Sequence, residues 1–532
     1  MSHHSLLRWP ALAGSLLTLA GAAVAAPPAG MDAYVARAMS AFEAPGMAIA
    51  IVEDGKTTLA KGYGIRKMGG SARVDEHSLF PIASNTKQFT ATALALLVDE
   101  GKLAWDDKVV SHLPGFQMHD AYVTGEMNIV DLLTHRSGLG LGQGDLMLIG
   151  TDFTAREIVE RLRHLKPARG FRSGYAYDNV LYIAAGQLIE AVARQRWEDF
   201  VRKRIFAPLG MKDSVPSFSD LRRGSNRASQ HGRRDGPMFG VGRIAPLSPV
   251  PPVNDVANPT GGINSSAADM AKWLAVQLGR GAAPGGKRLF SETQSAALWN
   301  PATLIPVRAA SGPLAATQAQ FQSYALGYVV SDYRGHKIIT HGGGWFGALS
   351  TTVLIPARNV GFAVMINSEE RGAMRSVELA LLDHYLGQPE TDWTPIVREV
   401  TTSRIDKALA AVTAKTADDS GGPPPSLALE KYAGVYRDPW YGTVTIRHAG
   451  GNALSIGFDR TPGMTGPLEP VRYDTFRTRW RDRSMEDAYV TFRLKPDGSI
   501  DHAVMQAISP LADFSFDYQD LLLTPEKVKP TP

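Results

Sequence analysis

The stretch Phe80-Pro-Ile-Ala-Ser-Asn-Thr-Lys-Gln-Phe-Thr90 stands directly before a long apolar run with helical spacing. Within it Ser84 and Lys87 are three residues apart, so the first turn of a helix would place both side chains on one face. A serine hydroxyl is a weak nucleophile unless a base takes its proton, and a lysine is that base only where its surroundings lower its pKa. The pattern predicts a nucleophilic serine; the alternative is two polar residues on the first turn of a surface helix.

Strand and helix patterns alternate along the chain around this stretch, which predicts an α+β fold. The helical patterns cover 31–42, 84–101, 128–138, 180–192 and 377–386. The strand patterns cover a hairpin at 45–64 and a meander at 324–367. The second strand of the meander ends at His341-Gly-Gly-Gly-Trp345, where glycines let a substrate lie close to the backbone.

A different pattern follows the linker Asp418-Asp-Ser-Gly-Gly-Pro-Pro-Pro425. Apolar residues alternate there with polar ones, last at Phe514, Phe516 and Tyr518, and about eight short strands predict a small antiparallel β-barrel. A helix over 404–415 is expected before the linker.

The N-terminus has the pattern of a secretory signal peptide. His3, His4 and Arg8 precede an apolar run over 9–20, and small residues before Pro27 offer a cleavage site. The alternative is a membrane anchor, but the run is short for a span of about 20 apolar residues. We expect a periplasmic or secreted protein with no stable membrane anchor after cleavage. The expected division of the chain is a signal peptide over 1–26, a catalytic domain over 27–395, a helix and linker over 396–426, and a barrel over 427–527.

Composition limits the partners and cofactors. The 532-residue chain has 56 Lys or Arg and 52 Asp or Glu, and this balance does not favour a nucleic-acid partner. No cysteine is present, which excludes disulfides, cysteine-ligated metals and a lipoprotein anchor. The arginine-rich residues 221–236 are read as a solvated loop rather than an anion-binding one, because no aromatic residues are interleaved. We expect no metal and no cofactor.

Two further motifs join the Ser84/Lys87 pair, namely Tyr177-Asp-Asn179 and His341-Gly-Gly343. In this order they resemble the S-x-x-K, Y-x-N and K/H-x-G motifs of the serine β-lactamase and penicillin-binding-protein family. Neighbouring strings resemble its class C, D-aminopeptidase and esterase branch, and these strings lie at 132–139, 182–190, 208–213 and 261–263. The resemblance covers roughly residues 30–390. It implies a β-lactamase/transpeptidase-like domain with an antiparallel sheet, flanking helices and a helical subdomain.

The resemblance also implies roles for the motif residues. Ser84 would be the acylated nucleophile, and Lys87 would deprotonate it directly or through Tyr177. Tyr177 would pass the proton to the leaving group and later activate the deacylating water. Asn179 would hold Lys87 and the substrate amide. The alternative for Tyr177 is a loop aromatic packed on the core.

The third motif carries the one departure from the family pattern. His341 stands where most members have lysine, and we expect its side chain to face the far end of the substrate, although a satisfied strand-end histidine is the alternative. A histidine is mostly neutral above pH 7, which argues against efficient β-lactam hydrolysis. The glycines of the motif, Gly343 and Gly344, would line the cleft. The backbone N–H groups of Ser84 and Gly344 would form the oxyanion hole.

These expectations favour an exported serine hydrolase that cleaves amide or ester bonds of a small molecule or short peptide, in particular a peptide with D-residues. The alternatives are a β-lactamase or penicillin-binding protein, and an idle relative that serves as a binding or assembly module. The barrel resembles a lipocalin-like C-terminal domain found on some of these hydrolases, and its roles would be passive stabilisation, ligand binding or self-association. Because all three motifs precede the linker, we expect the active site to need nothing from the barrel.

Overall fold

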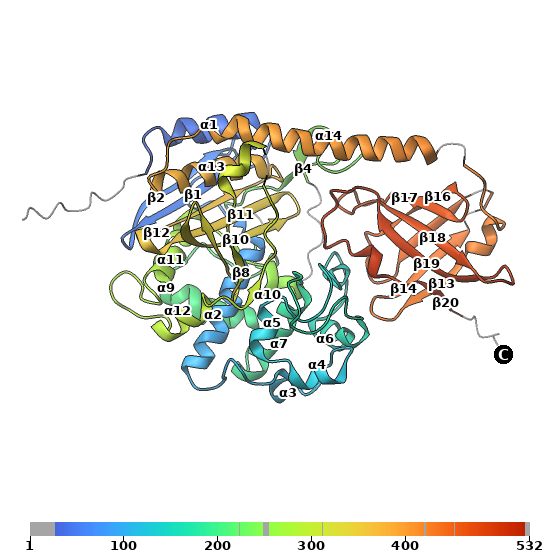
Figure 1. Cartoon of the computed structure of the whole chain (residues 1–532), viewed down its shortest axis with the longest axis horizontal. Helices are drawn as coiled ribbons and strands as arrows, with labels where there is room; N and C mark the ends of the chain where they lie inside the picture. Colours follow the sequence, from blue (N-terminus) through green and yellow to red (C-terminus); the bar gives the residue numbers. More distant parts are fainter. Residues whose placement is uncertain are drawn as a thin grey trace, which may run out of the picture.

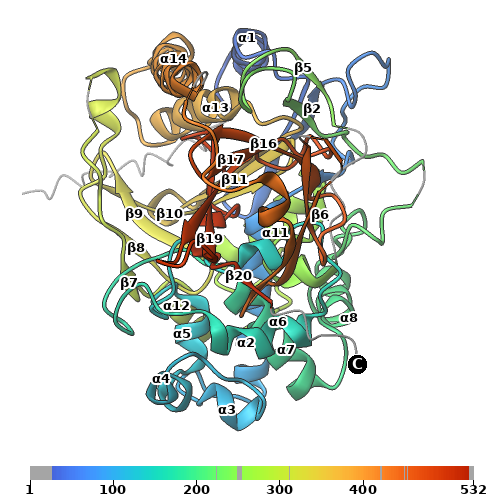
Figure 2. The same cartoon turned by 90° about the vertical axis from the view of Figure 1, so that its right-hand side faces the viewer.

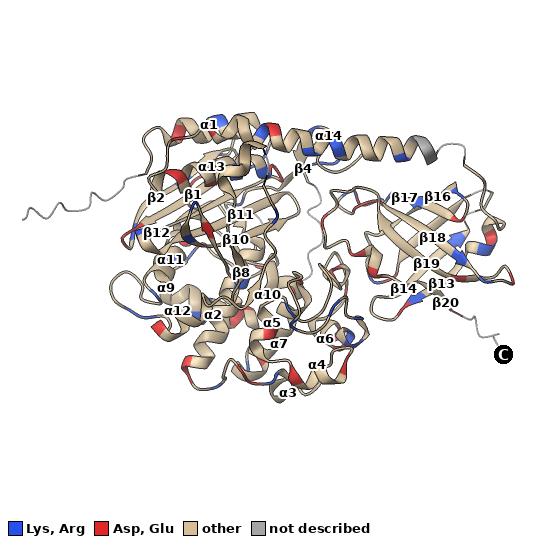
Figure 3. Cartoon of the chain, viewed as in Figure 1, with Lys and Arg blue, Asp and Glu red and all other residues tan. Residues whose placement is uncertain are grey.

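The computed structural model describes residues 27–222, 224–247, 255–310, 312–419, 422–448, 450–451 and 453–526 (Figure 1). The predicted signal peptide over 1–26 lies outside the described residues. None of the described helices is long and apolar enough to cross a lipid bilayer. Lys and Arg alternate with Asp and Glu over both halves of the molecule, without a face of one sign in this view (Figure 3).

The predicted antiparallel sheet is confirmed. It has eight strands in the order β2-β1-β12-β11-β10-β9-β8-β7. Its strands are β1 (Gly46–Glu53), β2 (Lys56–Gly64), β7 (Thr303–Leu304), β8 (Gln322–Tyr324), β9 (Val329–Tyr333), β10 (His336–Trp345), β11 (Ala348–Ile355) and β12 (Val360–Ile366). Two small antiparallel pairs stand outside it, β3 (Phe80–Pro81) with β6 (Asn264–Ser265), and β4 (His231–Arg233) with β5 (Ile244–Pro246).

Helices cover both faces of the sheet, so its central strands are buried on both faces. In β1, Met47, Ile49 and Ile51 face one hydrophobic core, while Ala48 and Ala50 face the other. The first core is covered by α1 (Met31–Ala41) and α13 (Arg371–Tyr385), and the second by α2 (Thr86–Asp99) and α11 (Ala267–Leu278). The helical subdomain completes this second side. Its helices are α3 (Val109–His112), α4 (Ala121–Glu126), α5 (Ile129–Leu133), α6 (Ala155–Arg161), α7 (Val180–Ala193), α8 (Trp197–Val201), α9 (Ala207–Leu209), α10 (Asn258–Gly261) and α12 (Glu292–Leu298).

Two helices differ from the sequence prediction. The helix expected to end at Gly138 ends at Leu133, because the chain turns at His135, whose φ is 53°. The helix expected over 404–415 is the 27-residue α14 (Trp393–Asp419). It starts beside α1 and α13 and runs along the top of the molecule towards the barrel (Figure 1). Few of its residues are buried (Trp393, Thr394, Val397, Ala408 and Val412), which is why no clear apolar stripe marked its full length.

The predicted C-terminal barrel is a nearly closed sheet of eight antiparallel strands, in the order β19-β18-β17-β16-β15-β14-β13-β20. A bridge between Ala503 and Leu523, with N–H···O distances of 2.8 and 3.0 Å, joins its two ends. Its strands are β13 (Gly434–Asp438), β14 (Gly442–His448), β15 (Leu454–Phe458), β16 (Thr465–Arg472), β17 (Thr475–Thr478), β18 (Ala488–Leu494), β19 (Ile500–Ala507) and β20 (Thr524–Pro525). Seen from its own side, the barrel lies in front of the eight-stranded sheet that begins with β2 and of the helices that cover this sheet (Figure 2).

One strand predicted for the barrel is wrong. Residues 508–522 form a loop with a short 3₁₀ turn at Tyr518–Asp520, although Phe514, Phe516 and Tyr518 alternate as in a strand. Local turns hold this loop, including the bond from Phe516 N–H to the Asp513 carbonyl. Phe516 and Tyr518 are buried, while Phe514 is 38% exposed. The alternation therefore reflects burial of a loop against its surroundings rather than a sheet register.

Candidate active site

Ser84 lies on a short 3₁₀ turn (Ala83–Asn85) directly before α2, rather than on the first turn of the helix itself. The strand pair β3–β6 and the bond from Ile82 N–H to the Ile263 carbonyl hold the chain before it. Ala83 has a φ of 48°, an unusual conformation for a residue other than glycine and one that costs on the order of 1 kcal/mol or more. This bend turns the Ser84 side chain towards Lys87, and Ser84 stays partly exposed.

Lys87 is completely buried, and its amine has three oxygen neighbours. Nζ lies 3.1 Å from Ser84 Oγ, 2.7 Å from Asn179 Oδ1 and 3.1 Å from the Thr260 carbonyl oxygen. The Asn179 and Thr260 oxygens can only accept hydrogen bonds, so they take two N–H groups. A neutral amine is then left with its lone pair facing the Ser84 hydroxyl.

The surroundings of Lys87 also lower its pKa to about 7. Burial is the main cause, and the carboxyl groups of Asp145 and Asp178 partly oppose it. The rings of Tyr177 and Tyr182 lie 4.8 and 5.1 Å from Nζ and stabilise the charged form in part. Near neutral pH a large fraction of the amine is therefore unprotonated and able to act as a base.

Tyr177 and Asn179 lie on the loop directly before α7. Burial raises the pKa of Tyr177 well above its ordinary value, and its hydrogen bond with Ser84 opposes this rise. Tyr177 is therefore protonated at neutral pH and able to donate a proton. Asn179 is fixed by three bonds, since its Oδ1 accepts from Lys87 and from Thr260 Oγ1 at 2.8 Å, and its Nδ2 donates to Asp145.

Asp145 is a site residue that the sequence analysis did not single out. Its Oδ2 accepts bonds from Asn179 Nδ2 at 2.7 Å and from Ser515 Oγ at 2.8 Å. The carboxyl is completely buried, and burial raises its pKa to about 7 in spite of these two bonds and the charge of Lys87. In the sequence it follows the glycines of residues 140–144, and no motif marked it.

The glycines of β10 lie against the Ser84 turn. A Cβ on Gly343 would stand 2.2 Å from the Ile82 carbonyl oxygen and 2.4 Å from Ser350 Oγ, so only glycine fits there. Ser350 Oγ donates to the same Ile82 carbonyl at 2.6 Å, which ties the next strand, β11, to the turn. A Cβ on Gly344 would meet only Leu349 at 3.6 Å, and Gly344 lines the adjoining cavity.

The side chain of His341 is not where we expected it. It is only 4% exposed, and both of its ring nitrogens have protein partners. Nδ1 lies 2.7 Å from the Gly342 carbonyl oxygen, which can only accept, so Nε2 accepts from the Tyr324 hydroxyl at 2.8 Å. Burial, with the charge of Lys87, lowers the pKa of His341 to about 3. The imidazole is therefore a neutral, satisfied interior group, and it does not face the cavity as a substrate ligand.

A cavity of about 530 Å³ opens beside Asn179, Thr260 and Gly344. Five arginines line it. Arg233 ends β4 and Arg234 follows it, Arg371 and Arg375 lie on α13, and Arg404 lies on α14. Its lining carboxyl groups are Asp145, Glu369, Glu370, Glu486 and Asp513. Burial raises the pKa of Glu486 to about 8, as it raises that of Asp145 to about 7, so the lining has an excess of positive charge at neutral pH.

The cavity arginines divide into paired and free groups. Arg233 binds Glu370 at 2.8 Å and also Glu43, while Arg234 binds Glu369 in a two-pronged ion pair. These two arginines of the 221–236 stretch are thus part of the packed interior, unlike the solvated loop that we expected. The side chains of Arg371 and Arg404 make no hydrogen bond or ion pair within the parts of the chain that the structure describes, although the carboxyl groups of Glu378 and Asp513 act on Arg371 from farther away.

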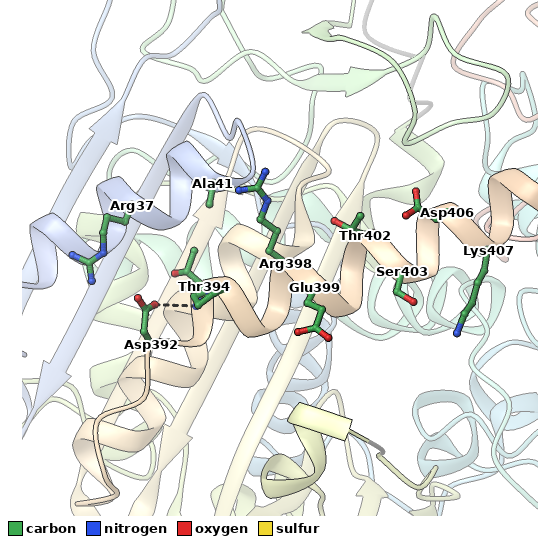
Figure 4. Close-up of a pocket in the computed structure, with 11 residues that line it drawn as sticks. Arg37, Ala41, Asp392, Thr394, Arg398, Glu399, Thr402, Ser403, Asp406 and Lys407 are labelled. Atoms are coloured by element: carbon green, nitrogen blue, oxygen red, sulfur yellow. Dashed lines mark hydrogen bonds between the residues drawn. The ribbon is translucent and has the colours of Figure 1, made fainter.

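A second hollow, of about 860 Å³, lies between α1 and the first turns of α14 (Figure 4). Arg37 and Ala41 border it on α1, and Arg398, Glu399 and Asp406 border it on α14. None of the predicted site residues lies there, and the chemistry is therefore placed in the cavity beside Asn179.

The site thus brings Ser84, Lys87, Tyr177 and Asn179 together, with Gly343 and Gly344 beside them. It adds Asp145 and Thr260, which sequence reasoning missed. Thr260 lies in a proline- and asparagine-rich stretch that we read only as a cleft wall, and its backbone carbonyl carries no sequence signal. Asp178 is inside the Tyr177 motif, but its burial and its raised pKa of about 7 were not foreseen.

Comparison with known proteins agrees with this geometry. Residues 31–386 match the family described as Beta-lactamase, and residues 418–525 match a domain of unknown function (DUF3471). An unguisins hydrolase of Aspergillus campestris (strain IBT 28561) is 29% identical over 488 residues, which cover 87% of this chain and 86% of that protein.

Solved structures of other proteins share the fold, and two of them illustrate it. The octameric penicillin-binding protein homologue from Pyrococcus abyssi superposes with a TM-score of 0.57 at 22% identity, over 93% of this chain and 98% of that one. The D-amino acid amidase from Ochrobactrum anthropi SV3 superposes with a TM-score of 0.53 at 22% identity, over 68% of this chain and 98% of that one. With a family match over more than half of its length, the chain belongs to the Beta-lactamase family.

Proposed function

We propose that this protein is a serine hydrolase that cleaves amide or ester bonds through an acyl-enzyme on Ser84. The observation that carries the proposal is the buried amine of Lys87. Two acceptor-only oxygens orient it, its third neighbour at 3.1 Å is the Ser84 hydroxyl, and its pKa is lowered to about 7. A structural lysine would be expected to keep a carboxylate partner at bonding distance, whereas this one contacts only neutral oxygens.

The reaction follows from these positions. Ser84 Oγ attacks the substrate carbonyl carbon while its proton passes to Lys87 Nζ, directly or through Tyr177. The negative oxygen that forms is bound by the backbone N–H groups of Ser84 and Gly344. Tyr177 donates its proton to the departing amine or alcohol and regains one from Lys87. A water molecule then attacks the acyl carbon, loses its proton to the same pair, and restores the Ser84 hydroxyl.

The substrate class we propose is a small molecule or short peptide, in particular one with D-residues. Relatives with the same fold are named as an unguisins hydrolase and a D-amino acid amidase, which supports amide cleavage. The lysine typical of the third motif is replaced by the neutral, buried His341, so this position supplies no cation for a β-lactam carboxylate. A β-lactamase or penicillin-binding protein is therefore the second candidate.

The charge of the cavity adds a preference for an acidic group on the substrate. The side chains of Arg371 and Arg404 form no ion pair within the described residues, and burial raises the pKa of Asp145 to about 7 and that of Glu486 to about 8, which weakens the negative charge of the lining at neutral pH. These two arginines would stabilise a substrate carboxylate that lies some distance from the scissile bond.

A substrate panel tests the proposal. We would measure hydrolysis of D-alanyl and L-alanyl anilides, short-chain aryl esters and a chromogenic cephalosporin by wild type and by Ser84→Ala. Serine-dependent turnover of anilides or esters above that of the cephalosporin is expected. Faster turnover of the cephalosporin would favour the β-lactamase alternative. No turnover and no acylation by any substrate would favour the idle binding or assembly module.

Export and self-association are separate proposals. We propose export to the periplasm or medium because of the signal-peptide pattern of residues 1–26. N-terminal sequencing of the mature protein should then begin near Pro27, and an intact N-terminus would contradict export. Self-association through the barrel is proposed by analogy with the octameric Pyrococcus protein. Sedimentation of wild-type protein tests it, and a monomer at all concentrations would contradict it.

A further inference from the structure

A loop of the barrel reaches the catalytic residues. Asp513 to Asp517 leave the barrel after β19 and pack between three parts of the catalytic domain. These parts are the turn at residues 142–146, the Tyr177 loop and the end of β10. The barrel, which we expected to contribute nothing to the active site, therefore contacts the residues around it.

The first contact is a chain of hydrogen bonds from the loop to the proposed base. Ser515 Oγ donates to Asp145 Oδ2 at 2.8 Å, and Asn179 Nδ2 donates to the same oxygen at 2.7 Å. Asn179 Oδ1 in turn accepts from Lys87 Nζ at 2.7 Å. The hydroxyl of Ser515 is thus three bonds away from the amine that faces Ser84.

The second contact holds the backbone around Asp145. The carboxyl of Asp517 is completely buried and accepts from the N–H groups of Gly144 at 2.6 Å and Leu146 at 2.9 Å. These two groups flank Asp145 in the chain, at the start of a 3₁₀ turn over Asp145–Met147. The barrel therefore supplies partners both for the side chain of Asp145 and for the turn that carries it.

The third contact forms a wall of the site. The ring of Phe514 lies 5.6 Å from that of Tyr177, and a Cβ on Gly142 would stand 2.4 Å from the Phe514 carbonyl oxygen. The ring of Phe516 packs against that of Phe346, which directly follows β10, with 6.2 Å between the ring centroids. Asp513, Ser515 and Phe516 also line the 530 Å³ cavity.

The barrel is fixed in this position by contacts on another part of its surface. Arg460 forms ion pairs with Asp152 and Glu157, and its carbonyl accepts from the Asp152 N–H at 3.1 Å. Arg161 Nη1 donates to the Trp440 carbonyl at 2.9 Å. The loop thus rests on a domain that is anchored independently of it.

We propose that Ser515 and Asp517 are positioning residues of the active site, which hold Asp145 and through it set the orientation of Asn179 and of the Lys87 amine. The inference rests on the proposed serine-hydrolase function. It makes the barrel loop a support of the catalytic centre, although neither residue touches the reacting atoms.

The test compares two serines of the same barrel in the full-length protein. Ser515→Ala removes the bond to Asp145, while Ser499→Ala removes an equally short bond of 2.7 Å, to Asp497 in the exposed turn between β18 and β19. For Ser515→Ala we expect kcat to fall about tenfold with KM within about threefold, as befits a lost bond to a charged group. Ser499→Ala should match wild type, and Ser515→Thr should recover most of the rate.

The pH profile separates positioning from general loosening. Without the Ser515 hydroxyl the pKa of Asp145 rises, so its negative charge beside Lys87 is lost and the pKa of Lys87 falls. The acid limb of kcat/KM should therefore move to lower pH in Ser515→Ala. A structural defect would lower the rate and leave the limb in place, which would overturn the inference.

Asp517→Asn gives a second readout that does not depend on Ser515. We expect reduced kcat and faster hydrogen exchange at the Gly144 and Leu146 amides, while β18 and β19 exchange as in wild type. Wild-type rates in both Ser515→Ala and Asp517→Asn would contradict the positioning role. Absence of any Ser84-dependent reaction in wild type would instead contradict the proposed function, so the two failures are distinguishable.

Discussion

Asp145→Asn removes one negative charge near Lys87 and keeps the shape of the site. The amide oxygen of the new side chain can still accept from Asn179 and Ser515, as Oδ2 of Asp145 does at 2.7 and 2.8 Å. Oδ1 of Asp145 is buried and has no partner among the described residues, so the new amide group would cost some stability there. The charge is therefore the main property that changes at the base.

The expected effect can be worked out from the bond chain. Lys87 Nζ to Asn179 Oδ1 and Asn179 Nδ2 to Asp145 Oδ2 are each 2.7 Å. Across the amide the two charges are then roughly 7 Å apart, which at an effective dielectric of about 20 corresponds to about 2 kcal/mol or about 1.5 pKa units. The pKa of Asp145 is about 7, so its carboxyl is only partly ionised near neutral pH and only part of this energy acts on Lys87. We therefore expect the pKa of Lys87 to fall by about one unit.

The assay is kcat/KM for a neutral aryl ester from pH 5 to 9. A carboxylate favours the ammonium form, so its loss makes Lys87 a free amine at lower pH, and the acid limb should move down by about one unit. Thermal unfolding at each pH controls for stability. An acid limb at the same pH as in wild type, in a folded and active variant, would refute the assignment of that limb to Lys87.

Three further predictions concern residues around the site. Gly343→Ala should lower the unfolding free energy by about 2 kcal/mol and nearly abolish activity, because its Cβ would stand 2.2 Å from the Ile82 carbonyl oxygen. The matched control is Gly342→Ala, whose Cβ would meet nothing within 4 Å. Equal losses of unfolding free energy in urea for the two variants would contradict this packing. The unfolding free energy of Asp178→Asn, relative to that of wild type, should increase by about 2 kcal/mol as the pH is raised from 5 to 8. Burial raises the pKa of Asp178 to about 7, so the folded wild type binds more protons than the unfolded chain and loses stability as pH rises. Urea unfolding at pH 5 and pH 8 measures this. The same difference between the two proteins at both pH values would argue against the raised pKa. His341→Lys should destabilise the protein by about 2 kcal/mol or more and leave the ratio of cephalosporin to ester hydrolysis unchanged, because the position is buried beside Tyr324; a stable variant with a higher ratio would restore His341 as a substrate-facing residue.

The sequence was sufficient for the parts of the molecule that depend on local pattern. The central strands of the sheet, α2 and α7 follow from apolar spacing, and the three motifs come together as their order predicts. The short separation of Ser84 and Lys87 made their contact predictable from helix geometry alone.

The remaining features depend on contacts between distant segments. Asp145 and Ser515 are separated by 370 residues, and neither lies in a recognisable motif. The loop over 508–522 was read as a strand because burial between two domains produces the same alternation as a sheet face. The orientation of His341 depends on the Tyr324 hydroxyl across the sheet, which no pattern within β10 could reveal.

In the proposed mechanism Ser84 becomes acylated, with Lys87 as its base. We would expose wild type, Ser84→Ala and Lys87→Ala to an acylating aryl ester, quench within milliseconds to minutes, and follow intact mass with peptide mapping. We predict one acyl group per chain, located on Ser84, absent from Ser84→Ala and formed at least about 100-fold more slowly in Lys87→Ala. Acyl transfer to another residue, or turnover of the same ester by Ser84→Ala at the wild-type rate, would contradict it.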